Sequence, residues 1–291
     1  MSLPGRLSTL PSNLAGKGLS YKAYPEQENT IDLKKTSLVL AHGLFGSKEL
    51  FDNVSKQIAI DGRKVIVYDA RNHGDSELSN EFDFASMAAD LSDLIGNFGL
   101  TEPIIMGHSM GGVTVMTLAL SNPEKIKALI VIDVAPVTSP VKDAFLSYSQ
   151  AMKKLSFPKD TSLIEAKSQA KSGLSKSVPD EQLLDFFLTN LILDDDGQVK
   201  WRGILDAFLN NHDQLFPELE MKSYKSFTKP ALFIFGENSV FYKADDLEKV
   251  KAIFPKAEIV IIKDAGHFLY DDKPAEFVAA VRRFCDDIDA S

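Results

Sequence analysis

At residues 107–112 the chain reads Gly-His-Ser-Met-Gly-Gly, and apolar runs stand directly before and after this stretch. The run at 103–106 is short enough for a buried strand, and the run at 113–120 suits a helix. A serine on such a turn must take strained backbone angles, and glycines two residues before and after it leave room for the neighbouring strand and helix. The pattern predicts a Ser109 hydroxyl exposed above a sheet edge, with the Met110 amide at the start of the helix behind it.

The composition is that of a soluble globular protein. The 291 residues are 44% hydrophobic and 25% charged, which is enough for one large α/β domain carrying an insertion. The net charge is −9 and the basic residues are scattered, so nothing favours a nucleic-acid partner. The single cysteine, Cys285, is predicted to be a buried thiol on a helix face, and the absence of internal disulfides fits a reducing compartment.

The sequence shows no sign of a membrane span or an export signal. No apolar stretch reaches about eighteen residues, and the N-terminus lacks the apolar core of a secretory signal. Residues 1–25 contain no acidic residue but are broken by prolines and glycines, so we expect a flexible leader there. We expect a soluble intracellular protein, cytoplasmic or in the mitochondrial matrix, without stable membrane insertion. Either a monomer or a dimer is compatible with the sequence.

Short apolar runs alternate with helical patterns along most of the chain. In the helical patterns, apolar residues recur at three- and four-residue spacing, most clearly over 84–98 and 277–288. Runs without such spacing suit parallel strands that are covered on both faces; they are 37–41, 64–69, 103–106, 128–133, 231–235 and 258–262. The alternation predicts an α/β fold with a mostly parallel, doubly wound sheet, which binds ligands at the carboxyl ends of its strands.

The alternation stops once, over residues 137–229. This span is too long for a loop, and it contains amphipathic pieces such as 180–188 and the only tryptophan, Trp201. We expect a helical cap here, inserted between two late strands and lying over the strand ends. The core would then comprise residues 26–136 and 230–291.

A serine nucleophile needs a base, and His267 is the best placed of the five histidines. It lies directly after the last predicted strand and downstream of Ser109. His108 is adjacent to the serine, so its side chain should leave the turn in another direction. We expect His108 to have a packing role, with a place in the wall of the substrate pocket as the alternative.

The acid that orients the base is less tightly specified. Asp133 ends the strand that follows the serine turn, 24 residues beyond Ser109, and an aspartate there can reach the imidazole from the side. The loop after the strand at 231–235 is a second usual place for this acid, and it offers Glu237. We favour Asp133, and Glu237 and the cap residue Asp206 remain alternatives. A capping aspartate that binds turn amides is the structural alternative for Asp133.

A glycine-rich loop closes an early strand at residues 40–47, which read Leu-Ala-His-Gly-Leu-Phe-Gly-Ser. Such a loop supplies the second backbone N–H of an oxyanion hole, here from Leu44, opposite the N–H of Met110. A phosphate-binding loop is disfavoured because no Lys-Ser or Lys-Thr pair follows the glycines. Leu44 and Phe45 would give the site an apolar wall, and Trp201 is a further candidate for the substrate pocket.

Residues 68–76, Tyr-Asp-Ala-Arg-Asn-His-Gly-Asp-Ser, cluster charged and small residues after a predicted strand. Such a cluster builds a hydrogen-bonded turn, in which Arg71 would bridge carbonyls or acids and Gly74 would allow a positive φ. The motif is predicted to brace the active-site loops and not to take part in catalysis.

These motifs together resemble a known family. The blocks at 42–47, 69–76, 107–112, 133–136 and 265–267 are similar to those of the α/β-hydrolases, in particular the YbfF-type acyl esterases and the α/β-hydrolase domain-containing protein 11 group. Related fungal alcohol acyltransferases share much of the pattern. The resemblance implies Ser109 as nucleophile, Asp133 as acid and His267 as base, with Leu44 and Met110 as oxyanion donors. It also implies ester or thioester substrates and neither a metal nor an organic cofactor.

The motifs are compatible with three functions. The leading hypothesis is a serine esterase that works through an acyl-enzyme. Acyl transfer to a small alcohol is the alternative within catalysis, and it differs in whether the pocket is dry enough for an alcohol to outcompete water. The alternative from another class is a ligand receptor that keeps the fold without turnover.

Overall fold

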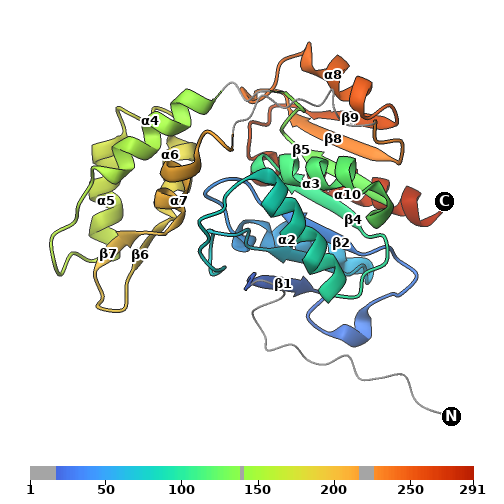
Figure 1. Ribbon diagram of the computed structural model, residues 1–291, viewed down its shortest axis with the longest axis horizontal. Helices are drawn as coiled ribbons and strands as arrows, with labels where there is room; N and C mark the ends of the chain where they lie inside the picture. Colours follow the sequence, from blue (N-terminus) through green and yellow to red (C-terminus); the bar gives the residue numbers. More distant parts are fainter. Residues whose placement is uncertain (1–17, 138–140, 216–225) are drawn as a thin grey trace.

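The computed structural model describes residues 18–137, 141–215 and 226–291 (Figure 1). Its centre is a seven-stranded sheet with the order β1-β3-β2-β4-β5-β8-β9, in which every neighbouring pair is parallel except β1 and β3. The strands are β1 (Tyr21–Tyr24), β2 (Leu38–Ala41), β3 (Val65–Tyr68), β4 (Ile104–His108), β5 (Ala128–Ile132), β8 (Ala231–Gly236) and β9 (Ala257–Ile262). The predicted α/β-hydrolase fold with a mostly parallel, doubly wound sheet is confirmed.

Helices cover both faces of this sheet (Figure 1). The core helices are α1 (Asp52–Ile58), α2 (Phe84–Asn97), α3 (Met110–Ser121), α8 (Asp246–Ile253), α9 (Leu269–Asp272) and α10 (Pro274–Asp289). The described part of the core also contains four 3-10 turns, at Glu28–Thr30, Lys48–Phe51, Ala59–Asp61 and Pro123–Lys125. The strands are apolar on both sides because each strand contributes alternate residues to two separate cores. In β4, Ile105 packs with α2 and α3, whereas Ile104 and Met106 pack with α1 and α10.

Between β5 and β8 the chain leaves the sheet and forms a helical unit on one side of it (Figure 1). The unit contains α4 (Lys142–Lys153), α5 (Leu163–Leu174), α6 (Glu181–Leu188), α7 (Ile204–Asn211) and the hairpin of β6 (Leu191–Leu193) and β7 (Val199–Trp201). These elements fall in the span where a cap was expected, parts of which, 138–140 and 216–225, lie outside the described residues. Among the helices described, none is both long and apolar enough to cross a membrane.

The N-terminal boundary differs from the expected one. Residues 1–17 lie outside the described residues, but Tyr21–Tyr24 form β1, which pairs antiparallel with β3 at the edge of the sheet. A leader reaching to residue 25 is therefore wrong. The strand escaped prediction because its half-buried edge position gives no continuous apolar run, whereas β2 and β3, which are equally short, are fully buried.

Cys285 lies on the buried face of α10, as predicted. Burial raises the pKa of its thiol to about 12. A thiol with such a pKa carries almost no thiolate at neutral pH, so this cysteine fills space and is unreactive.

Candidate active site

Ser109 lies between β4 and α3 with φ 53° and ψ −115°, backbone angles that a residue with a side chain rarely adopts. The turn is possible because of the glycines around it. A Cβ on Gly107 would lie 2.1 Å from the Gly111 oxygen, and one on Gly111 would lie 2.3 Å from the Ala41 oxygen. The Ser109 amide donates to the Ile132 oxygen at 3.0 Å, which fixes the turn against β5. The strand, sharp turn and helix predicted from the sequence are therefore present.

Asp133 and His267 are brought together next to this turn. Nδ1 of His267 lies 2.6 Å from Oδ2 of Asp133, whose side chain is completely buried. Asp133 directly follows β5, and His267 is in the loop after β9, so two parallel strands place these side chains at the same edge of the sheet. Since a carboxylate only accepts hydrogen bonds, the imidazole carries its proton on Nδ1, which leaves Nε2 able to accept a proton.

Ser239 is a member of this cluster that the sequence did not reveal. Its Oγ donates to Oδ2 of Asp133 at 2.5 Å and accepts the Phe241 amide at 3.1 Å, and the Gly236 amide donates to Oδ1 at 2.9 Å. A serine stands in the loop after β8, where an acid is often found. The position of this serine was the signal available in the sequence. A hydroxyl cannot replace the acid, but it can donate a hydrogen bond to an acid from another strand.

A small cavity of about 60 Å³ contains Ser109. It is almost entirely apolar, and the core and the cap both contribute to its wall: Leu44, Phe84, Met110, Val113, Val134, Val141, Phe145, Leu215 and Phe241. The Phe241 ring also stacks on the His267 imidazole, with centroids 3.5 Å apart and planes 9° apart. Phe241 thus connects the cavity wall to the imidazole.

The loop after β2 is held by two histidines. The Ala70 amide donates to Nε2 of His42 at 3.0 Å, and the Phe45 amide donates to Nε2 of His73 at 3.1 Å. Both rings must therefore carry their proton on Nδ1, and these nitrogens donate to the Gly43 and Arg71 oxygens.

The amides predicted as oxyanion donors remain available. Within residues 18–137, 141–215 and 226–291, neither the Leu44 nor the Met110 N–H has an acceptor in the chain. The Met110 amide is free because the first N–H groups of a helix have no partner within it. Both residues line the cavity that contains Ser109.

The motif at 68–76 has the bracing role that was predicted. Arg71 makes a two-pronged ion pair with Asp90 of α2, at 2.7 and 2.8 Å. Gly74 has φ +51°, and a Cβ there would collide with the Asp69 carboxylate. Asp69 in turn accepts the amide and the ammonium of Lys48 at 2.7 and 2.6 Å, which ties the turn to the loop after β2.

Three residues predicted as candidates for the substrate pocket do not line the cavity at Ser109. The Phe45 ring packs edge-on against Phe187 and Phe208 of the cap. The His108 ring packs against Phe51 and Tyr270, and its Nε2 donates to the His267 oxygen at 3.0 Å. Trp201 is in the β6–β7 hairpin and is partly buried against the apolar cluster that core and cap share. Proximity in sequence and aromatic character placed these residues in the pocket, and tertiary packing directs them elsewhere.

The two alternative acids lie away from the imidazole. Glu237 is an exposed residue whose Oε2 accepts the Asp264 amide at 3.0 Å. Asp206 is on α7 of the cap, where it pairs with Lys153 at 2.5 Å. Of the three candidate acids, only Asp133 contacts His267.

Burial suppresses the charge of the three supporting histidines. The pKa of His108 and that of His73 are held well below 6.5, mainly by burial and in addition by a neighbouring histidine. Burial also lowers the pKa of His42, and the Lys48 ammonium adds to this effect. The three rings are therefore neutral at pH 7, and the amides that donate to Nε2 of His42 and of His73 require this for those two rings. In the part of the chain that the structure describes, no group of three or more His, Cys, Asp or Glu could hold a metal ion.

A serine on a strained turn, an imidazole paired with a buried carboxylate, and a glycine-rich loop at the carboxyl ends of parallel strands together define an α/β-hydrolase. The family model described as alpha/beta hydrolase fold matches residues 36–274, and the chain belongs to this family. Its named relatives make it an enzyme of the esterase and lipase type.

The comparisons agree with the resemblance given by the sequence motifs. The chain is 36% identical over 252 residues to the sn-1-specific diacylglycerol lipase ABHD11 of Danio rerio, covering 86% of this chain and 78% of the relative. It is 28% identical over 269 residues to Ethanol acetyltransferase 1 of Wickerhamomyces anomalus, covering 85% and 68%. The solved structure of a marine microorganism esterase is similar with a TM-score of 0.82 at 30% identity, covering 92% of this chain and all of the other.

The buried histidines make stability depend on pH. The pKa values of His42, His73 and His108 are lower in the folded chain than the 6.5 of a free histidine. Below pH 6.5 the unfolded chain therefore binds protons that the folded chain does not. We expect the free energy of unfolding to fall as the pH drops from about 7.5 to about 5.5, by up to roughly 1.4 kcal/mol per pH unit for each histidine.

Urea unfolding at a series of pH values measures this slope. The His108→Gln variant should show a shallower slope in the same range, because one of the three titrating groups is gone. A stability that stays constant between these pH values would contradict the neutral, buried state of the three rings.

Proposed function

We propose that the protein is a serine hydrolase that cleaves carboxylic esters or thioesters through an acyl-enzyme intermediate. Ser109 is the nucleophile, His267 the base and Asp133 the acid that orients the base. The observation that carries this proposal is the 2.6 Å contact of His267 Nδ1 with the buried Asp133 carboxylate, next to a serine on a strained turn.

The reaction follows from the protonation state of the imidazole. In acylation, Nε2 of His267 takes the Ser109 proton while Oγ attacks the ester carbonyl, and the N–H groups of Leu44 and Met110 donate to the oxygen that becomes negative. The imidazolium then gives its proton to the leaving alcohol or thiol as the bond to the carbonyl carbon breaks. In deacylation, His267 activates a water molecule, which attacks the acyl-enzyme and regenerates Ser109.

Asp133 stabilises the imidazolium that forms in each step. Its carboxylate is completely buried and already accepts the Gly236 amide and the Ser239 hydroxyl, so it does not need to reorganise when the charge appears. Ser239 acts through Asp133 and is a positioning residue.

The apolar cavity supports an acyl group as the part of the substrate that lies beside Ser109. Its wall includes Val141, Phe145 and Leu215 from the span 137–229. We therefore propose that this span is a lid that completes the acyl site over the core formed by residues 26–136 and 230–291. Exclusion of water by such a wall strengthens the interactions that stabilise the oxyanion.

Labelling of the serine tests the proposal directly. A fluorophosphonate probe should label the wild-type protein and should fail to label Ser109→Ala, because only a serine activated by a base attacks the phosphorus centre. Hydrolysis of a p-nitrophenyl ester should be lost together with labelling. Absence of labelling in a correctly folded wild-type protein would instead favour the non-catalytic receptor.

Replacement of the acid tests the triad. Asp133→Asn should lower kcat by about 10³- to 10⁴-fold, because an amide at this position favours the wrong imidazole tautomer. The matched substitutions Glu237→Gln and Asp206→Asn should keep kcat within about twofold, since neither side chain contacts His267. Near-full activity in Asp133→Asn, measured with the same p-nitrophenyl ester, would remove Asp133 from the mechanism.

Acyl transfer to an alcohol is a second candidate function, favoured by the similarity to an ethanol acetyltransferase. The two activities share the acyl-enzyme and differ in whether water or an alcohol attacks it. If the enzyme is a transferase, product analysis with ethanol added should show an ethyl ester in place of part of the free acid. If it is a hydrolase, the free acid should be the only product that carries the acyl group at every ethanol concentration that leaves the protein folded.

A further inference from the structure

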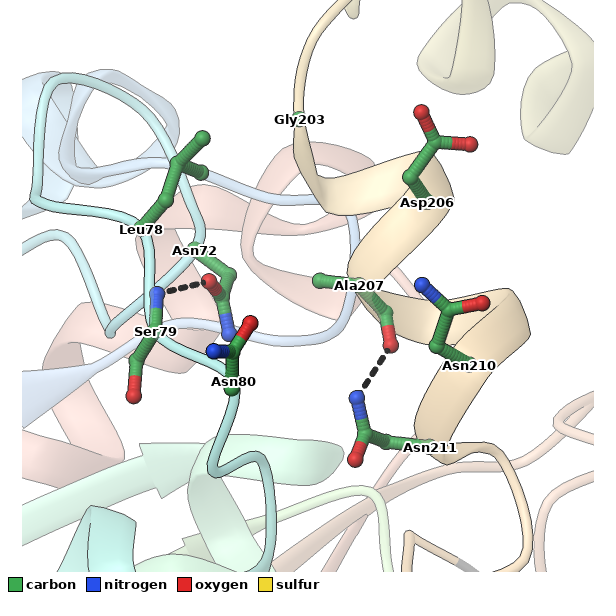
Figure 2. Close-up of a pocket in the computed structure, with 9 residues that line it drawn as sticks. All are labelled: Asn72, Leu78, Ser79, Asn80, Gly203, Asp206, Ala207, Asn210 and Asn211. Atoms are coloured by element: carbon green, nitrogen blue, oxygen red, sulfur yellow. Dashed lines mark hydrogen bonds between the residues drawn. The ribbon is translucent and has the colours of Figure 1, made fainter.

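A second cavity lies between the loop that precedes α2 and the cap helix α7 (Figure 2). Its volume is about 430 Å³, which is within the range of small-molecule sites. It shares no lining residue with the cavity at Ser109. The residues that line it are Asn72, Leu78, Ser79, Asn80, Gly203, Asp206, Ala207, Asn210 and Asn211.

The wall of this cavity is polar but carries little charge. Four of its residues are asparagines, and each carboxamide offers both N–H donors and an acceptor oxygen. No lysine or arginine is among the described residues of the wall, so a phosphate or carboxylate would find no counter-charge. Asp206 is the one ionisable residue of this wall, and it already pairs with Lys153 at 2.5 Å. The wall therefore suits a neutral ligand that both donates and accepts hydrogen bonds.

Asn72 gives an independent indication that a ligand binds here. Its side chain is only 3% exposed, and its Oδ1 accepts the Ser79 amide at 2.7 Å (Figure 2). Its Nδ2 is buried and has no hydrogen-bond partner among the described residues. Leaving a buried donor unsatisfied costs free energy, so a small shift of the Asn72 side chain that brings Nδ2 to a ligand oxygen at the cavity wall would be stabilised.

The cavity also has an apolar side. Leu78 is 69% exposed at its rim, close to Gly203 at the start of α7. The carboxamides stand on both walls, two on the loop and two on α7, and the exposed aliphatic side chain of Leu78 stands at the rim (Figure 2). This mixture matches a sugar ring, which has hydroxyl groups around its edge and C–H groups on its faces. The volume is also large enough for a ring of this size.

We propose that this cavity binds a neutral, hydroxyl-rich group of monosaccharide size. This group could be the alcohol part of an ester substrate or a free sugar. The first source rests on the proposed function and is structurally reasonable, because the same segments line both cavities. On the core side, Asn80 lines the second cavity and Phe84 lines the cavity at Ser109. On the cap side, Asn211 lines the second cavity and Leu215 lines the cavity at Ser109.

Binding of methyl α-glucoside to the unmodified full-length protein, titrated by NMR, tests the site without any need for catalysis. The Asn210→Leu variant removes an exposed carboxamide at nearly constant size, and Asn72→Asp replaces the buried Nδ2 donor while keeping the acceptor for the Ser79 amide. Each should raise Kd about tenfold. The same two changes at the exposed Asn53 of α1, Asn53→Leu and Asn53→Asp, are the matched controls and should leave Kd unchanged.

Several results would overturn the site. They are no binding of methyl α-glucoside, binding of inorganic phosphate that is equally tight, or an unchanged Kd in Asn210→Leu. The last result decides the matter even if Asn72→Asp does not fold, because the Asn210 side chain is exposed.

A kinetic comparison then identifies the source of the group. The ratio of kcat/KM for methyl 6-O-octanoyl-glucoside to that for ethyl octanoate should fall about tenfold in Asn210→Leu if the sugar is the alcohol part of the substrate. An unchanged ratio, together with weakened binding of methyl α-glucoside, supports the site and assigns it to a free sugar. If the wild-type protein hydrolyses neither ester, the proposed function fails, and the binding titration still decides the inference.

Discussion

Three hydrogen bonds converge on the buried carboxylate of Asp133, and the geometry of the site depends on them. The donors are the amide that ends β8, the hydroxyl of Ser239 and the imidazole of His267. Burying an ionised carboxylate is costly unless donors surround it, so the arrangement is stable only when both donor segments, residues 236–239 and the loop after β9, are in place. A separate hydrogen bond also holds the loop after β9, because the His267 oxygen accepts one from His108 next to the serine.

Backbone strain is concentrated at the same end of the sheet. Phe45, Ser109 and Asp133 all have positive φ values, between 52° and 63°, although none of them is a glycine. Such a conformation costs of order 1–3 kcal/mol per residue and persists only where the surroundings enforce it. At Ser109 the close passage of Gly107 and Gly111 enforces it, and at Asp133 the three donors do so. The segments that contain these three strained residues meet above the same edge of the sheet.

The sequence predicted those parts that depend on local patterns. Apolar runs predicted the six mutually parallel strands, and the glycines around Ser109 predicted the turn. The ends of two parallel strands had to meet, which is why Asp133 and His267 could be named together. The support from Ser239 and the stacking of Phe241 could not be predicted, because both depend on the path of a loop after β8. Phe45 and Trp201 were misplaced for a similar reason, since only tertiary packing decides which aromatic side chains face a cavity and which fill the seam between cap and core.

Contacts between cap and core also hold the glycine-rich loop after β2. The Phe45 amide donates to His73 of the core, and the Phe45 oxygen accepts a hydrogen bond from Asn190 of the cap at 2.9 Å. The residue after Leu44 is therefore held from both sides, and the cap contributes to the position of the Leu44 amide. A second contact, from Arg202 to the Gly74 oxygen at 2.7 Å, attaches the cap to the turn that carries His73. The cap thus acts on the site through the backbone of the loops that surround the serine, as well as through the apolar side chains of the cavity wall.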